Sequence, residues 1–186
     1  IITLLPGSQD HIVANGGRRE KIFWIPNGVD LGRFPLPSSP QLSGPFTVMY
    51  FGAHGPYNGL EKVVKAAEIL AERGWTPEEL QIVLMGEGPL KENLVERAKE
   101  GAGSGLIRFR PPVPKSGLWD AIQDADAFLM VVKPMPSFEK GMSPNKLWDY
   151  LAAGRPVLFS TVGGERMAAE TGAGLAVPPG NPQALA

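Results

Sequence analysis

The chain has 186 residues, of which 43% are hydrophobic and 20% charged, a composition that supports one buried core and excludes a large two-domain enzyme. Its 18 Lys and Arg balance 19 Asp and Glu, and neither sign is concentrated in any segment, which argues against a nucleic-acid-binding protein. Cysteine is absent and the two histidines, His11 and His54, lie far apart, which excludes a disulfide framework, a cysteine nucleophile and a thiolate or histidine metal cluster.

The longest apolar run, residues 127–132, is far shorter than the roughly 20 residues that cross a bilayer, so we predict no membrane segment in this chain. We expect a cytoplasmic protein, which in its full-length form can work at the inner face of the membrane. The first residues, Ile-Ile-Thr-Leu-Leu-Pro, contain neither an initiator Met nor the features of a signal peptide. We therefore expect the chain to be a fragment.

Residues 1–45 differ in pattern from the rest of the chain. They contain one predicted strand at 22–25 and then four prolines, Pro35, Pro37, Pro40 and Pro45, which make an extended connector. Beyond them, apolar runs alternate with amphipathic patterns. Strands are predicted at residues 47–52, 80–85, 106–109, 127–132, 156–160 and 174–177, and helices at 60–71, 90–98, 117–123, 144–153, 165–171 and from 182 onward.

Strands that are apolar throughout and alternate with helices predict an α/β fold: a doubly wound, Rossmann-like parallel sheet with helices on both faces. Such sheets bind ligands in the crevice beyond the carboxyl ends of their strands. Function is therefore expected in the loops that begin at Gly52, Gly86, Arg110, Lys133 and Thr161.

The first of these loops, residues 52–59, joins a buried strand to a helix. Gly52 and Gly55 would let backbone N–H groups approach an anion, and the following helix N-terminus would favour negative charge. The spacing matches neither the Gly-x-Gly-x-x-Gly fingerprint nor a P-loop. A tight turn without a ligand is the alternative, and His54 is either a phosphate donor or an exposed loop residue.

Residues 143–156 carry a second candidate motif. Ser143 is predicted to cap a helix whose first position is Pro144, which directs the helix N-terminus toward the crevice. Lys146 and Asp149 then share one helix face. Lys146 would bind a phosphate and Asp149 would accept two vicinal hydroxyls; the alternative is a surface ion pair between them.

Two further loops are weaker candidates. Residues 109–114, with Arg110, Pro112 and Val113, form a proline-stiffened loop that could be a shelf for a flat base or a plain connector. Glu139 lies in the long loop of residues 133–142, where it is either part of a catalytic scaffold or exposed to solvent.

The motifs together resemble those of retaining GT-B glycosyltransferases of family four (glycosyl transferases group 1), in their C-terminal, donor-binding domain. The Ser-Pro-Asn-Lys form is most similar to the bacterial branch that builds lipopolysaccharide, O-antigen and capsule. The matching residues occur in the family's order at 25–30, 34, 86–89, 109–113, 124–127, 143–156, 163–164 and 180–182.

The resemblance implies a set of site roles. It implies that Glu139 and Lys146 are catalytic residues and that Asp149 binds the ribose of the donor. Asp149 stands at the position of the second Glu of the family's Glu-x7-Glu motif. The first acid of that motif would fall at Gly141, and Glu139 is the nearest carboxylate. With the loop interpretations above, we assign the diphosphate to Gly52, His54, Gly55, Ser143, Asn145 and Lys146, and the base to Gly86, Arg110, Pro112 and Val113. Among the diphosphate residues, Lys146 matches the family's pattern, whereas His54 does not.

The reaction that the resemblance implies is transfer of a sugar, with retention, from a nucleoside diphosphate sugar, most simply a UDP-sugar, to a glycan or lipid-linked acceptor in cell-surface polysaccharide synthesis. It needs no metal or other cofactor. Residues 1–34 would be the end of an N-terminal, acceptor-binding domain and a connector. Residues 35–186 would be the nucleotide-sugar-binding domain, cut short at its C-terminus and inactive alone.

Two alternatives to a transferase stay open. A sugar-nucleotide epimerase of the same fold would need an acid and a base in the cleft, for which His54 and Glu139 are the available groups. A non-catalytic nucleotide-binding domain is favoured by Gly141 in place of the family's first acid.

Overall fold

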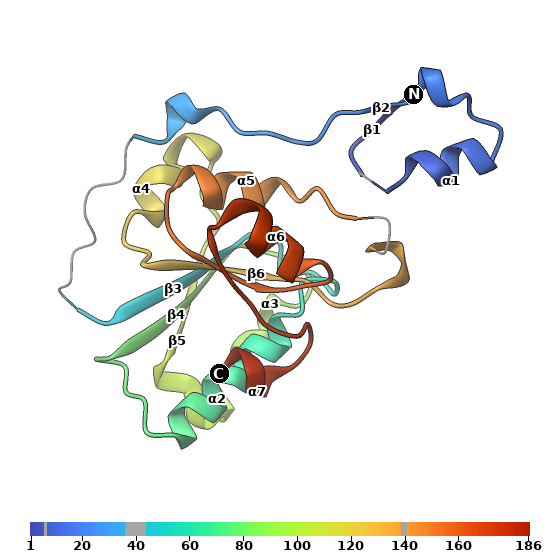
Figure 1. Cartoon of the computed structure of the whole chain (residues 1–186). Helices are drawn as coiled ribbons and strands as arrows, with labels where there is room; N and C mark the ends of the chain where they lie inside the picture. The colour runs from blue at the N-terminus through green and yellow to red at the C-terminus, as the bar shows by residue number, and fades with distance from the viewer. Residues whose placement is uncertain (6, 36–43, 139–140) are drawn as a thin grey trace.

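A parallel sheet forms the centre of the computed structural model, which describes residues 1–5, 7–35, 44–138 and 141–186 (Figure 1). All strand pairings in this sheet are parallel, and the strand order is β5-β4-β3-β6-β7-β8. The strands are β3 (Phe46–Phe51), β4 (Leu80–Met85), β5 (Ile107–Arg110), β6 (Ala127–Val131), β7 (Val157–Ser160) and β8 (Gly174–Ala176).

Helices cover both faces of the sheet, which confirms the predicted doubly wound α/β fold (Figure 1). One face is covered by α2 (Leu60–Glu72), α3 (Lys91–Glu100) and α7 (Pro182–Leu185), and the other by α4 (Leu118–Ile122), α5 (Asn145–Ala152) and α6 (Gly164–Thr171). Short 3-10 turns lie at η3 (Ala102–Gly105), η4 (Lys115–Gly117) and η5 (Pro136–Phe138). The predicted elements from residue 47 onward are present, with ends displaced by at most a few residues.

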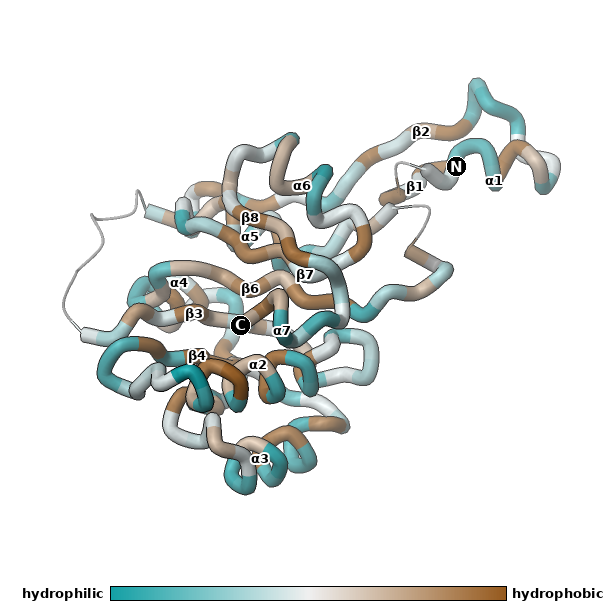
Figure 2. Tube along the Cα trace, turned by 60° about the horizontal axis from the view of Figure 1, so that its bottom comes forward, coloured by the Kyte–Doolittle hydropathy of each residue, from teal (hydrophilic) through white to brown (hydrophobic). Residues whose placement is uncertain are grey.

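Two apolar clusters, one on each side of the sheet, stabilise this arrangement. In β3, Met49 and Phe51 pack with Tyr150 of α5, whereas Tyr50 between them packs on the side of α2. This alternation follows from the two-residue period of a strand, which sends successive side chains to opposite faces. Figure 2 shows the corresponding pattern, with hydrophobic residues along the strands and hydrophilic ones on the outer turns of α3.

The N-terminal residues form a small unit at the end of an extended connector (Figure 1). Its strand β1 (Ile2–Thr3) pairs in parallel with β2 (Phe23–Trp24), and the segment between them contains α1 (Gln9–Ala14) and η1 (Arg19–Lys21). The predicted strand at 22–25 corresponds to β2. β1 and α1 were not predicted, because a two-residue strand and a six-residue helix with no buried side chain produce no readable hydrophobic period.

The connector also contains the turn η2 (Leu31–Arg33), and directly after it Phe34 contacts the main domain. The Phe34 ring meets Trp119 of α4 edge to face, with 6.1 Å between ring centroids. The predicted proline-stiffened stretch falls largely on residues 36–43, which lie outside the described part of the chain.

The strand order determines where the crevice of the sheet lies. The chain passes from β3 outward through β4 to β5 and then returns to the other side of β3 with β6, so β3 and β6 are neighbours at a topological switch point. In open α/β sheets the loops at the carboxyl ends of such strands diverge and leave room for a ligand.

Candidate functional site

A cavity of about 510 Å³ lies at the carboxyl ends of β3, β4 and β5, against the N-terminal turns of α5. Four separate parts of the sequence converge on it. Residues predicted as site residues that line it are Gly52, Gly86, Pro112, Val113, Asn145, Lys146 and Asp149. The rest of the lining is Phe51, Ala53, Asn58, Met85, Glu87, Lys115 and Leu118.

Gly52 and Gly86 allow the loops after β3 and β4 to touch. A Cβ atom at Gly86 would lie 1.9 Å from the Gly52 carbonyl oxygen, so only glycine permits this approach. The Gly52 N–H donates to the Met85 carbonyl at 3.0 Å and the Gly86 N–H to the Arg110 carbonyl at 3.1 Å, which extends the strand pairing into the loops. At these two glycines the floor of the cleft is therefore bare backbone.

The Lys146 side chain reaches this floor from the first turn of α5. Its Nζ donates to the Tyr50 hydroxyl at 2.9 Å and to Oδ1 of Asn58 at 3.2 Å, and it lies 4.2 Å from the centroid of the Tyr50 ring. Burial lowers the pKa of Lys146 to about 7, because a charged amine loses hydration there. Lys146 therefore does not form the alternative surface ion pair with Asp149, because its ammonium is bonded to two neutral groups.

Asp149 lies one turn further along α5, on the same cleft. Its carboxyl is partly buried, and this desolvation raises its pKa. The positive charges of Lys115, from η4, and Arg33, from the connector, act in the opposite direction. Asp149 is thus the acceptor in the wall of the cleft, with two cations that favour its ionised form.

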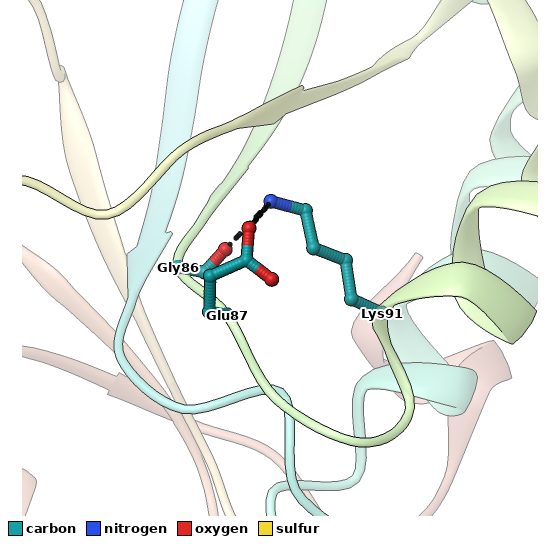
Figure 3. Close-up of polar contacts among 3 residues, drawn as sticks. All are labelled: Gly86, Glu87 and Lys91. Carbon is teal, nitrogen blue, oxygen red and sulfur yellow. Dashed lines mark hydrogen bonds and ion pairs between the residues drawn. The ribbon is translucent and has the colours of Figure 1, made fainter.

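The loop after β4 is braced by Lys91, at the start of α3 (Figure 3). The Lys91 Nζ donates to the Gly86 carbonyl at 2.9 Å and forms an ion pair with the Glu87 carboxylate. The hydrogen bond from Lys91 lowers the pKa of Glu87. This places an ionised carboxylate at the rim of the cavity and commits the Gly86 carbonyl to a protein donor.

A sequence model of the glycosyl transferases group 1 family matches residues 45–186, the whole of the main sheet and its helices. The chain belongs to this family. No protein with a curated description matches it.

Solved structures that resemble this group 1 chain have the same fold. Anabaena Alr3699/HepE in complex with UDP and glucose has a TM-score of 0.73 at 19% identity, with 99% of this chain and 50% of that one covered. Sucrose-phosphate synthase (tll1590) from Thermosynechococcus elongatus has a TM-score of 0.67 at 20% identity, with 99% of this chain and 46% of that one covered. The lipopolysaccharide outer core galactosyltransferase WaaB has a TM-score of 0.61 at 16% identity, with 84% of this chain and 42% of that one covered. This chain spans half or less of the length of each.

His54 of this group 1 chain is fully buried, so its alternative interpretation as an exposed loop residue is wrong. Its ring lies with centroids 6.2 Å from both Tyr50 and Phe109, behind the Gly86 backbone and outside the cavity lining. Neither ring nitrogen has a hydrogen-bond partner among the described residues. Burial, followed by the charge of Lys91, lowers the pKa of His54.

The backbone of His54 has a structural part in the same loop. Its N–H donates to the Glu87 carbonyl at 2.7 Å, and its carbonyl accepts from the Leu90 N–H at 3.0 Å. These bonds join the loop after β3 to the loop after β4. The predicted contact of the His54 side chain with a diphosphate stays a prediction. For that contact the His54 ring, which lies behind the Gly86 backbone, would have to reach the cavity.

Ser143 does not cap the helix, which corrects the predicted capping. The helix begins at Asn145, with Pro144 in an extended conformation at the cap position and no side-chain capping bond. Ser143 instead accepts a hydrogen bond from the Asn27 N–H at 3.1 Å through its hydroxyl. A residue before a proline is biased toward extended backbone, and here the connector supplies its partner.

Other predicted site residues do not line the cavity or fall outside the described residues. Gly55 and the exposed Arg110 are not in the cavity lining, although the Arg110 carbonyl accepts from Gly86. Glu139 falls outside the described residues. Gly141, where the family's first acid was expected, has φ +100°, a conformation that favours glycine over any side chain.

Several cleft residues were not predicted. Tyr50 reads as an ordinary core residue of a strand, and nothing in the local pattern marks its hydroxyl. Lys115 directly follows the proline-rich loop of residues 109–114, so its position next to the predicted shelf was the available signal. Asn58 lies in the loop of residues 52–59, and its polar side chain is the only local feature that suggests a function.

The described part of the chain contains neither a membrane-spanning helix nor a clustered set of metal ligands. No helix there is long and apolar enough to span a membrane. In the same residues, no group of three or more His, Asp or Glu side chains is placed to hold a metal ion.

Proposed function

We propose that this chain binds the donor of a retaining glycosyltransferase, which moves a sugar from a nucleoside diphosphate sugar, most simply a UDP-sugar, to a glycan or lipid-linked acceptor. One observation carries the proposal: Lys146 and Asp149, one turn apart on α5, both face the cavity at the switch point of the sheet. A cation and a carboxylate at this separation match the two polar parts of a nucleotide, its phosphates and its ribose.

The diphosphate would lie over Lys146 and the N-terminus of α5. Free N–H groups at a helix N-terminus attract anions, and Asn145 adds a polar side chain at the same point. When the bond from the sugar to the diphosphate breaks, negative charge grows on the departing oxygen while the sugar becomes oxocarbenium-like. Lys146 would stabilise that charge from a position in which little rearrangement is needed.

The nucleoside would lie on the other side of Asp149. A carboxylate can accept hydrogen bonds from both ribose hydroxyls, and the loop residues Pro112 and Val113 offer an apolar shelf for a base. Gly86 also lines the cavity, but its N–H and its carbonyl are already bonded within the protein.

Family membership and the structural neighbours support the choice of donor. Anabaena Alr3699/HepE was solved with UDP-glucose, and S. aureus TarM, another neighbour, with UDP. The WaaB neighbour is a lipopolysaccharide galactosyltransferase, which supports a role in cell-surface polysaccharide synthesis. We further propose that residues 35–186 bind the donor and that residues 1–34 connect them to an acceptor-binding domain.

Nucleotide binding to the chain tests this proposal directly. We expect UDP or another nucleoside diphosphate to raise its melting temperature, and Asp149→Ala to abolish that increase. The matched control is Asp120→Ala, which removes an exposed carboxylate from α4. If no nucleoside diphosphate shifts the melting temperature, the proposal is wrong; binding without transfer by the complete enzyme would favour a non-catalytic nucleotide-binding domain.

A further inference from the structure

We propose that Tyr50 and Asn58 are positioning residues, which hold the Lys146 ammonium at the floor of the cleft through neutral acceptors and thereby couple diphosphate binding to protonation of Lys146. This inference rests on the proposed function, because it assigns the diphosphate to Lys146. It adds two residues that no motif of the sequence marks as functional.

The Tyr50 hydroxyl is oriented to accept from Lys146. It donates its own proton to the Ala53 carbonyl at 2.7 Å, so its lone pairs are left for the ammonium at 2.9 Å. Tyr50 itself is fully buried within β3, which prevents the phenol from turning away. The hydroxyl is therefore a fixed acceptor, whose position depends on the sheet rather than on a loop.

The Tyr50 ring and the Asn58 amide complete the cradle. The ammonium lies 4.2 Å from the ring centroid, within the range of a cation–π interaction, and Oδ1 of Asn58 accepts from it at 3.2 Å. Both partners are uncharged. They direct the ammonium without neutralising it, which leaves its full charge for an anion in the cleft.

Gly52 keeps the approach to this ammonium open. A Cβ atom at Gly52 would lie 3.2 Å from the Tyr50 hydroxyl and 3.5 Å from the Lys146 nitrogen. Any side chain there would crowd the space between the cavity and the ammonium. The position directly after β3 therefore requires glycine if an anion is to reach the Lys146 ammonium.

Charged and titratable groups face Lys146 from several elements. Tyr50 on β3 contacts its ammonium, and the charge of Lys146 acts on His54 in the following loop. Glu87 after β4, Lys115 on η4 and Asp149 on α5 line the same cavity, and Lys91 pairs with Glu87. Within the described residues, the Glu87 carboxylate pairs with Lys91, and neither it nor Asp149 forms an ion pair with Lys146. With no bonded carboxylate to offset burial, the pKa of Lys146 falls to about 7.

The sign of the coupling follows from these charges. Near and above neutral pH, part of the free protein carries an uncharged Lys146, whereas the diphosphate complex favours the charged form. Binding should therefore take up a proton, and affinity should fall as pH rises through and beyond neutrality. Without one of the acceptors of the Lys146 ammonium, the affinity should begin to fall at a lower pH, because the charged form of Lys146 has lost a hydrogen bond.

The experiment measures UDP binding to the 186-residue chain by calorimetry from pH 7 to pH 9, where the terminal phosphate of UDP, with a pKa of about 6, is already ionised. We expect the affinity of the wild type to fall by up to about tenfold per pH unit, with proton uptake visible as a dependence of the heat on the buffer. Tyr50→Phe and Asn58→Ala should each move the curve to lower pH, by about one unit for Tyr50→Phe.

Tyr57→Phe is the control, because it also removes a phenol hydroxyl, from an exposed side chain in the loop of residues 52–59 that is not part of the cavity lining. Its curve should overlay that of the wild type. If the wild type binds UDP and both Tyr50→Phe and Asn58→Ala also overlay it, the inference is wrong and the proposed function stands. If the wild type binds no nucleoside diphosphate, the proposed function fails and the inference fails with it.

Discussion

Asn27 and Ser143, which are 116 residues apart in the chain, are joined by two hydrogen bonds. The Asn27 backbone N–H donates to the Ser143 hydroxyl at 3.1 Å, and the Asn27 amide Nδ2 donates to the Ser143 carbonyl at 2.6 Å. Because Ser143 lies just before α5, this contact ties the connector to the loop that presents Asn145 and Lys146 to the cleft.

Asn27→Ala should therefore weaken both the fold and the cleft. The substitution removes one hydrogen bond and leaves the partly buried Ser143 carbonyl without that partner, which should lower the free energy of unfolding by about 1 kcal/mol. Urea denaturation measures this, and UDP affinity should fall as well. Asn15→Ala is the control, since the Asn15 amide donates only to the exposed His11 carbonyl. Equal losses in the two variants would contradict a specific role of Asn27.

The burial of His54 should make stability depend on pH. In the unfolded chain a histidine takes up a proton below its usual pKa of 6.5, whereas burial lowers the pKa of His54 in the folded state. The unfolded state then binds more protons, so the free energy of unfolding should decrease as pH falls below about 6.5. Urea denaturation at a series of pH values measures the slope.

His54→Leu should reduce this slope, and the exposed His11 offers a matched control. His11→Leu should leave the slope of the wild type in place. A slope that is unchanged by His54→Leu would mean that other groups, and not the buried imidazole, control acid stability.

The contact between the two glycine loops should be sensitive to one methyl group. Gly86→Ala would place a Cβ atom 1.9 Å from the Gly52 carbonyl oxygen, so the loops must separate. We expect a loss of about 2–4 kcal/mol in the free energy of unfolding and loss of UDP binding. Gly117→Ala, at a position with nothing within 4 Å, should cost less than about 1 kcal/mol. Equal melting temperatures for the two variants would contradict the close approach.

Asp126, which directly precedes the neighbouring strand β6, supports the start of β3. Its Oδ2 accepts from the Thr47 N–H at 2.8 Å, while its own N–H donates to the Thr47 carbonyl at 2.9 Å. Asp126→Ala leaves the Thr47 N–H without its acceptor and should cost about 1–3 kcal/mol, measured by urea denaturation. Asp124→Ala, an exposed neighbour, should have little effect, and a cost similar to that of Asp126→Ala would argue against this bond.

Much of the fold was predictable because its signals are local. The six apolar runs from β3 to β8 end at or near glycine or polar residues, and the amphipathic pattern of residues 60–71 is clear within α2 alone. The pairing of β3 with β6 was not predicted strand by strand, because it depends on contacts between segments far apart in the chain.

The candidate site was predictable only in part. Lys146 and Asp149 were found because their spacing on a helix is visible in sequence, and the structure places both on one cavity. His54 was assigned an anion-binding or exposed position, because loop glycines around it suggest exposure. Its burial results from Phe109 and Gly86, which arrive from two other strands.

The sequence by itself determined the α/β class, the order of strands and helices, and the α5 motif, because hydrophobic period and glycine placement act over a few residues. Only the tertiary structure decided that Tyr50 and Asn58 hold Lys146, that Lys115 and Arg33 face Asp149, and that Ser143 binds Asn27. The reason is physical: hydrogen bonds, burial and pKa shifts arise between side chains that meet only when the sheet brings distant segments together.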